Sequence, residues 1–251
     1  MSRLVLAFAL SALCACQKPL DARLQAGDTA ARAGKWEDAR ARWTEATELD
    51  AHCAAAFAKL GVALWELGRK DEAASAWSQA VALEPSGEDA LEGLARLDLE
   101  RLDAGAAVSR LLTVPAPAAT SFQLVLAQSL LARGGPDDAA AALVAAQHAA
   151  AASPADPEVD YLIGSAQIAL RRFSDAQATL EGLQRRRPES PLGSYGLARL
   201  AAAQSRQTDA LLHLSAARAA AGSGWNPERV AADPAFAFLL SAPEFKALVG
   251  K

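Results

Sequence analysis

The residues of this 251-residue chain best able to bind a metal or act as nucleophiles are a few cysteines and histidines. Cys14 and Cys16 lie one residue apart after an apolar run, and Cys53 follows His52. The other histidines are His148 and His213. A structural zinc site needs four ligands at regular spacing, and a catalytic thiol needs a base held beside it. Since these residues are scattered, and neighbours in sequence usually point apart, we expect no catalytic site, no metal and no cofactor.

The first cysteine pair follows the pattern of an export signal. Arg3 gives a short positive start, and the apolar run Leu4 to Leu13 has the length of a signal-peptide core. A membrane-spanning helix would need about 20 apolar residues. The next four residues, "LCAC" at 13–16, resemble the bacterial lipobox. The resemblance implies cleavage before Cys16, lipidation of Cys16 and loss of Cys14 with the signal.

The lipobox resemblance predicts a lipid-anchored protein of the bacterial cell envelope. Residues 1–15 are then a lipoprotein signal peptide and 16–19 a lipidated tether. Gln17 stands where an aspartate would retain a lipoprotein in the inner membrane of typical two-membrane bacteria. We therefore expect the outer membrane, with the chain facing the periplasm. An ordinary secretory signal and a metal-binding cysteine pair remain the alternatives at this stage.

The composition indicates an all-α protein. Alanine and leucine dominate the sequence, aromatic residues make up 6%, and no segment alternates apolar with polar residues as a half-buried strand would. Alanine and leucine lose little side-chain freedom in a helix, so both favour that structure. The formal net charge is -4, with the basic residues dispersed. This distribution argues against a nucleic-acid partner.

A repeat of 34 residues organises the chain. "GKWEDARARWTEATELD", beginning at Gly34, aligns with "GRKDEAASAWSQAVALE", beginning at Gly68. Trp43 then pairs with Trp77 at the same offset. Small and bulky residues at helical spacing, a glycine at the turn and Pro85 as a stop predict two packed helices per repeat.

The second repeat resembles the tetratricopeptide repeat. The residues that carry the resemblance are Phe57, Leu60, Gly61, Leu64, Ala73, Trp77 and Pro85. It implies a right-handed superhelical solenoid of about six helical hairpins over residues 20–223. The expected repeats are 20–53, 54–87, 88–119, 120–153, 157–190 and 191–223. The third is the least regular, and small breaks are expected near 115–119 and 153–156.

The tail, residues 224–251, leaves the repeat register and predicts a C-terminal helical cap. Asp233 before Pro234 and Ser241 before Pro243 are helix-start signals. An open solenoid end needs a cover over its last apolar face. The side chains expected to supply it are Phe236, Phe238, Leu239, Phe245 and Leu248.

The resemblance also implies a concave groove lined by the first helix of each repeat, where a peptide could dock. Its expected partner-binding residues are Trp65, Leu99, Gln128, Tyr161, Ser165, Tyr195 and Arg199. The aromatic members would be the best anchors, although several of these residues could equally be packing. The interpretation is a non-enzymatic, lipid-anchored scaffold for an envelope protein or peptide.

Family analogues of such a scaffold include pilotins for type IV pilus secretins, barrel-assembly lipoproteins and adaptors for peptidoglycan hydrolases. Two alternatives stay open. One is a structural module that self-associates through its convex face or cap, and the other is a tetratricopeptide regulator without a lipid.

Overall fold

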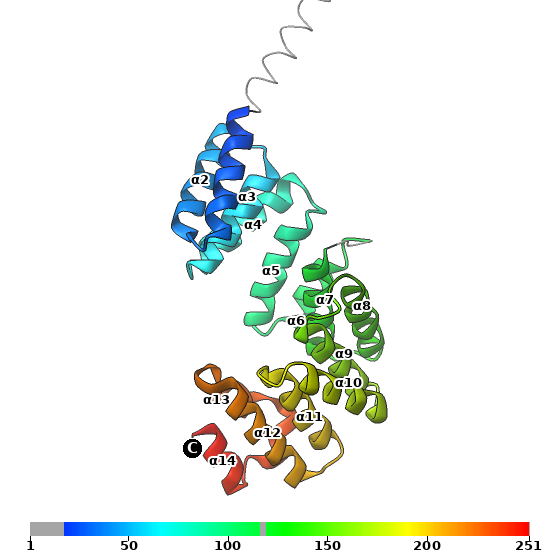
Figure 1. The fold of residues 1–251 in the computed structure, drawn as a ribbon. Helices are drawn as coiled ribbons and strands as arrows, with labels where there is room; N and C mark the ends of the chain where they lie inside the picture. Colours follow the sequence, from blue (N-terminus) through cyan, green and yellow to red (C-terminus); the bar gives the residue numbers. More distant parts are fainter. Residues whose placement is uncertain (1–17, 116–118, 251) are drawn as a thin grey trace, which may run out of the picture. The chain divides into compact units, whose positions relative to one another are not determined.

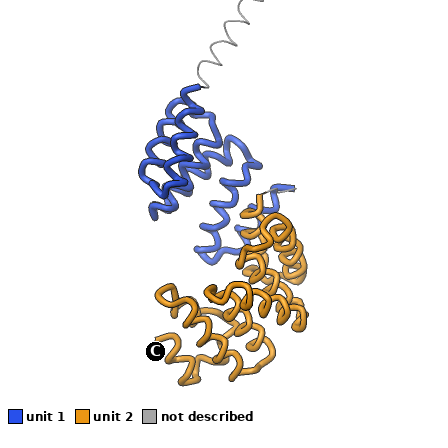
Figure 2. The backbone as a smooth tube through the Cα atoms, in the orientation of Figure 1, with its two compact units in different colours: residues 1–117 blue, residues 118–251 orange. Residues whose placement is uncertain are grey.

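The structure is a computed structural model that describes residues 18–115 and 119–250. The chain folds into two compact units, one up to residue 117 and the other from residue 118 (Figure 2). Cys14 and Cys16, on which the lipobox prediction rests, lie outside the described residues. No strand occurs in the part of the chain that is described, which confirms the expected all-α class.

The first unit contains three helical hairpins (Figure 1). Its first helix covers residues 18–32. The helices that follow are α2 (Trp36–Leu49), α3 (Ala54–Glu66), α4 (Lys70–Leu83), α5 (Glu88–Glu100) and α6 (Ala104–Leu111). The residue 18–32 helix pairs with α2, α3 with α4, and α5 with α6. The third hairpin has a short second helix, in line with its weak repeat signal.

The second unit contains three more hairpins and the tail. The hairpin helices are α7 (Thr120–Arg133), α8 (Asp138–Ala152), α9 (Pro157–Ala169), α10 (Phe173–Arg186), α11 (Pro191–Ala203) and α12 (Gln207–Ala221). The tail forms η1 (Gly222–Gly224), α13 (Pro227–Ala232), η2 (Pro234–Leu239) and α14 (Pro243–Val249). Helices α7, α9 and α11 pack in sequence order along one side of this unit.

Five of the six described hairpins share one turn geometry, and the turn between α7 and α8 differs because the Gly135 amide donates to the Asp138 side chain. Gly68 adopts the left-handed region at φ +75°, and the next residue, Arg69, donates its amide hydrogen to the Leu64 carbonyl. This is the usual way to satisfy the last carbonyls of a helix, and glycine adopts it at low cost. Other hairpins make the same turn without glycine. The left-handed residues there are Leu102, Arg171 and Ser205.

Bulky side chains of the second helices are seated against glycines of the first helices. Trp77 of α4 is 2% exposed, and a β-carbon at Gly61 of α3 or Gly93 of α5 would overlap its ring. The Trp77 Nε1–H donates to the Ala58 carbonyl at 3.1 Å, which fixes the ring between the two helices. Figure 1 shows α3, α4 and α5 packed as neighbours in the first unit. The glycines therefore set how closely successive hairpins stack.

The second unit repeats this arrangement with an aliphatic side chain. Leu180 of α10 is fully buried, and it contacts the positions where Gly164 of α9 and Gly196 of α11 would carry a β-carbon. The same device therefore works with either a tryptophan or a leucine, provided that both facing positions lack a side chain.

The tail covers the end of the last hairpin. Element η2 packs on α11 and α14 packs on α12. Phe236, Leu239 and Phe245 are each no more than 1% exposed, as expected for a cap. The prediction for Phe238 was wrong, because the η2 helix turns that ring outward and leaves it 45% exposed. Val230 and Val249 contribute to the cap core instead.

No helix within residues 18–115 and 119–250 has both the length and the apolar character needed to cross a membrane.

The packing of Trp77 against Gly93 can be tested by a stability measurement. Gly93→Ala should lower the free energy of unfolding by about 1–3 kcal/mol, because the added methyl group would overlap a buried ring. Gly105→Ala in α6 is the matched control, since its new β-carbon would lie 3.5 Å from the Asp103 Oδ1, an ordinary contact. Urea unfolding followed by circular dichroism measures both. Equal stabilities of the two variants would contradict this packing role.

Candidate functional site

Three of the predicted groove residues meet in the second unit. Tyr161 lies on α9, and Tyr195 and Arg199 lie on α11. An Arg199 guanidinium nitrogen donates to the Tyr161 hydroxyl at 3.1 Å, and the two tyrosine rings are 6.3 Å apart. The repeat thus brings side chains 38 residues apart in sequence into contact.

The cap joins this cluster through Asp233, the N-cap residue of η2. The Tyr195 hydroxyl donates to Asp233 Oδ2 at 2.6 Å, and Arg199 Nε lies 3.5 Å from the same oxygen. The Tyr195 ring also packs edge to face on Phe236 at 5.7 Å. Tyr195 is therefore a link between the groove side of α11 and the cap, as well as a surface residue.

Burial and charge fix the ionisation of this cluster. Burial, then the hydrogen bond to Asp233, raises the pKa of the Tyr195 hydroxyl far above its usual range. Burial alone would lower the pKa of Arg199, but the neighbouring Tyr161 and Asp233 raise it overall. At neutral pH Tyr195 is an uncharged donor and Arg199 is a cation.

A pocket of about 130 Å³ opens beside this cluster. We call it the cap pocket, because residues from the start of the tail line it together with residues of α9, α11 and α12. Its lining residues are Tyr161, Pro191, Leu192, Tyr195, Ala221, Gly224, Trp225, Asn226, Arg229 and Val230. The indole Nε1–H of Trp225 donates to the Leu248 carbonyl at 3.1 Å, which holds that ring in place. The pocket has aromatic and aliphatic walls with few polar groups.

The other predicted groove residues of the second unit are placed differently. Gln128 of α7 is half-buried and donates a hydrogen bond to Glu158 of α9, so it ties two hairpins together. Ser165 of α9 is only 6% exposed, and its hydroxyl finds no hydrogen-bond partner within residues 18–115 and 119–250. Its oxygen is held inside the unit instead of being presented to solvent.

Trp65 and Leu99 belong to the first unit. Trp65 of α3 is half-buried, with its ring 6.0 Å from that of Trp77 and the Lys70 ammonium 5.3 Å from its centroid. Leu99 of α5 is also half-buried. Both therefore offer part of their surface to solvent while they pack against the hairpin core.

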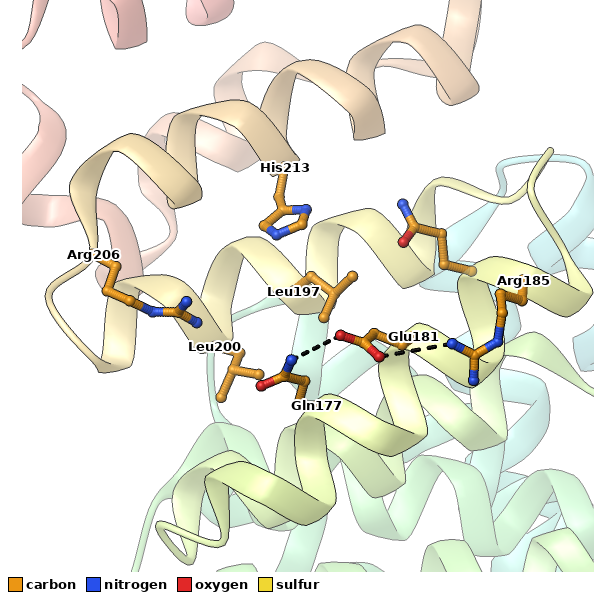
Figure 3. Close-up of a pocket in the computed structure, with 8 residues that line it drawn as sticks. Gln177, Glu181, Arg185, Leu197, Leu200, Arg206 and His213 are labelled. Carbon is orange, nitrogen blue, oxygen red and sulfur yellow. Dashed lines mark hydrogen bonds and ion pairs between the residues drawn. The ribbon is translucent and has the colours of Figure 1, made fainter.

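A second depression, of about 270 Å³, lies between α10, α11 and α12 (Figure 3). Glu181 accepts a hydrogen bond from Gln177 and pairs with Arg185, and His213 points toward them from α12. Burial lowers the pKa of His213, so the imidazole is neutral at pH 7. Because the carboxylate of Glu181 already has partners in this depression, we favour the cap pocket as the binding site.

Of the ten residues that line the cap pocket, only Tyr161 and Tyr195 were predicted from the sequence. Trp225 and Arg229 are two of the eight that were missed. Both lie in "GWNPER", where the Asn226 side chain accepts the Arg229 amide hydrogen and Pro227 begins α13. Asparagine before proline is a helix-start signal. That signal was present in the tail and would have placed a helix here.

The comparisons with known proteins agree with this architecture. A family model of the tetratricopeptide repeat matches residues 24–90, 124–176 and 161–224, which together make up more than half of the chain. The chain belongs to the tetratricopeptide repeat family. Proteins of this family generally bind other proteins or peptides and are not catalysts. No curated protein sequence matches the chain.

Solved tetratricopeptide structures share the fold at low sequence identity. PilF from Pseudomonas aeruginosa is 18% identical with a TM-score of 0.65, covering 84% of this chain and 95% of its own. PilW, a type IV pilus biogenesis factor, is 16% identical with a TM-score of 0.62, and the match covers 80% of this chain and 92% of PilW. YrrB, which has an unusual peptide-binding site, is 16% identical with a TM-score of 0.56, covering 71% and 91%. These likenesses establish the fold.

The link between Tyr195 and Asp233 predicts a pH effect on stability. A folded-state pKa raised above the unfolded value of about 10 stabilises the fold below pH 10, and this contribution is lost as the pH rises further. Tyr195→Phe should therefore lower the melting temperature at pH 7. Between pH 10 and 11 the melting temperature of this variant should fall by less than that of the unsubstituted protein. Thermal melts by circular dichroism test this, and parallel pH profiles for the two proteins would contradict it.

Proposed function

We propose that this chain is a lipid-anchored tetratricopeptide scaffold of the bacterial cell envelope that binds a partner protein and takes part in assembling an envelope complex. The observation that carries the binding role is the cap pocket. It is a concave, largely apolar site with Tyr161, Tyr195 and Trp225 in its walls. Sites that bind ligands are typically concave, apolar and supplied with a few convergent polar groups, and tyrosine and tryptophan dominate interface energetics.

The anchor is supported by the sequence that precedes the first helix. Cys16 is two residues before Lys18, the first described residue, which lies in the helix at residues 18–32. Two extended residues span only about 7 Å, so lipidation at Cys16 would hold the first hairpin close to the bilayer. A partner in the same membrane, or in the layer beneath it, fits this geometry better than a distant one.

The kind of complex is suggested by the structural likenesses. PilF and PilW are matched along nearly their whole length, and PilW is a pilus biogenesis factor. We therefore take a pilus-related envelope complex, with a pilotin-like role, as the first candidate, and an adaptor for a peptidoglycan hydrolase as the second. Both roles use the same scaffold.

The anchor is tested by Cys16→Ser. The substituted protein should accumulate as an uncleaved precursor, as should the unsubstituted protein treated with globomycin. Cys53→Ser is the matched control, because Cys53 is the N-cap of α3 and serine suits that position. Fractionation and migration on gels provide the measurement. A Cys16→Ser protein that behaves as the unsubstituted one does would refute lipidation.

Partner binding is tested by a pair of leucine variants. Leu192 lines the cap pocket, whereas Leu212 on α12 is 66% exposed and does not line it. After mild crosslinking of the native envelope, Leu192→Ser should reduce recovery of the partner at least several-fold, and Leu212→Ser should leave it unchanged. Helical spectra and membrane location should match in both. Equal recovery of the partner from both variants would show that the cap pocket does not bind it.

A further inference from the structure

The size of the cap pocket limits what can enter it. Its volume of about 130 Å³ is close to that of an engineered cavity of about 150 Å³ that holds one benzene molecule. The pocket therefore has room for a single large apolar side chain, such as a phenylalanine or a leucine. Tyr161, Tyr195 and Trp225 all line the pocket, so an inserted side chain would contact aromatic rings.

The charge at the pocket is positive. All ten lining residues are described, and Arg229 is the only one among them with a formal charge. Its side chain is exposed, and no hydrogen bond or ion pair ties its guanidinium to another residue within 18–115 and 119–250. The acidic group of the neighbouring cluster, Asp233, is already held by Tyr195 and Arg199. Arg229 thus has its donors available.

The chemistry of arginine specifies the complementary group. A guanidinium presents a planar fork of donors that matches a carboxylate, and such charge-assisted pairs are stronger than neutral hydrogen bonds. Glu228 precedes Arg229 on α13, but consecutive helical residues point about 100° apart, so its carboxylate faces another direction. The apolar pocket and the arginine at its rim therefore favour an apolar side chain with an acidic neighbour.

We propose that the cap pocket recognises an internal acidic peptide segment of the partner, in which a large apolar side chain enters the aromatic-lined pocket and a flanking aspartate or glutamate pairs with Arg229. This inference rests on the proposed scaffold function and specifies the partner chemistry of the same site. It assigns the recognition to the cap and the last two hairpins.

Labelled peptides test the inference on the full protein purified in detergent. The probe is a nine-residue peptide with an N-terminal fluorescein and an amidated C-terminus, with Glu-Phe-Glu at its centre and Gly-Ser-Gly on each side. Fluorescence anisotropy should show on the order of fivefold weaker binding for Gln-Phe-Gln, because an exposed ion pair contributes up to about 1 kcal/mol. Glu-Ala-Glu should bind more weakly still, and high salt should remove the preference for glutamate.

Charge reversal identifies the arginine. Arg229→Glu should invert the preference, so that a Lys-Phe-Lys peptide binds more tightly than Glu-Phe-Glu. Arg172→Glu is the matched control, since Arg172 is an exposed arginine of the same unit that does not line the pocket. It should leave the preference unchanged. Melting temperatures confirm that both variants are folded.

Three results would overturn the inference. They are equal binding of Glu-Phe-Glu and Gln-Phe-Gln, an unchanged preference in Arg229→Glu, and binding that requires a free C-terminal carboxylate. The inference would also be overturned if no amidated peptide bound at concentrations up to about 1 mM. A Kd of that size corresponds to a binding free energy of only about 4 kcal/mol. If the peptides fail while Leu192→Ser still reduces partner recovery, the scaffold function stands and only the acidic recognition falls.

Discussion

The stacking of this chain depends on the contact between one bulky side chain and two glycines. Trp77 fits between α3 and α5 because Gly61 and Gly93 have no β-carbon where the ring lies, and Leu180 occupies the same position between α9 and α11. Through these bare positions α4 contacts both α3 and α5, and α10 contacts both α9 and α11. Interiors packed to crystal-like density tolerate no extra methyl group there. The spacing of α3 and α5, and that of α9 and α11, follows from this contact.

The cap uses the surface that this spacing creates. Tyr195 of α11 packs on Phe236 and donates to Asp233, so the end of the array is closed by the same residue that forms part of the cap pocket. Stability and recognition are therefore coupled at α11. A substitution of Tyr195 would disturb both, whereas Leu192 and Arg229 line the pocket and do not belong to the buried cap core.

Features that repeat could be predicted from the sequence, because a period makes them visible. The common offset of Trp43 and Trp77 located the hairpins. The left-handed turns at Leu102, Arg171 and Ser205 could not be predicted, since glycine is the residue that normally indicates this conformation. The pairing of Tyr195 with Asp233 joins residues 38 apart across the boundary between repeat and tail, where no period applies. The predicted burial of Phe238 was wrong, because sequence spacing does not fix which side of a short helix such as η2 faces the core.

The central claim, that the cap pocket contacts a partner in the envelope, is tested most directly by photo-crosslinking in living cells. A photoreactive amino acid in place of Gly224 is suitable, because Gly224 lines the pocket and a side chain there would meet no atom within 4 Å. The account predicts an adduct with one envelope protein from position 224 and none from exposed position 212. No adduct from position 224, or one with the mass of two copies of this chain, would contradict it.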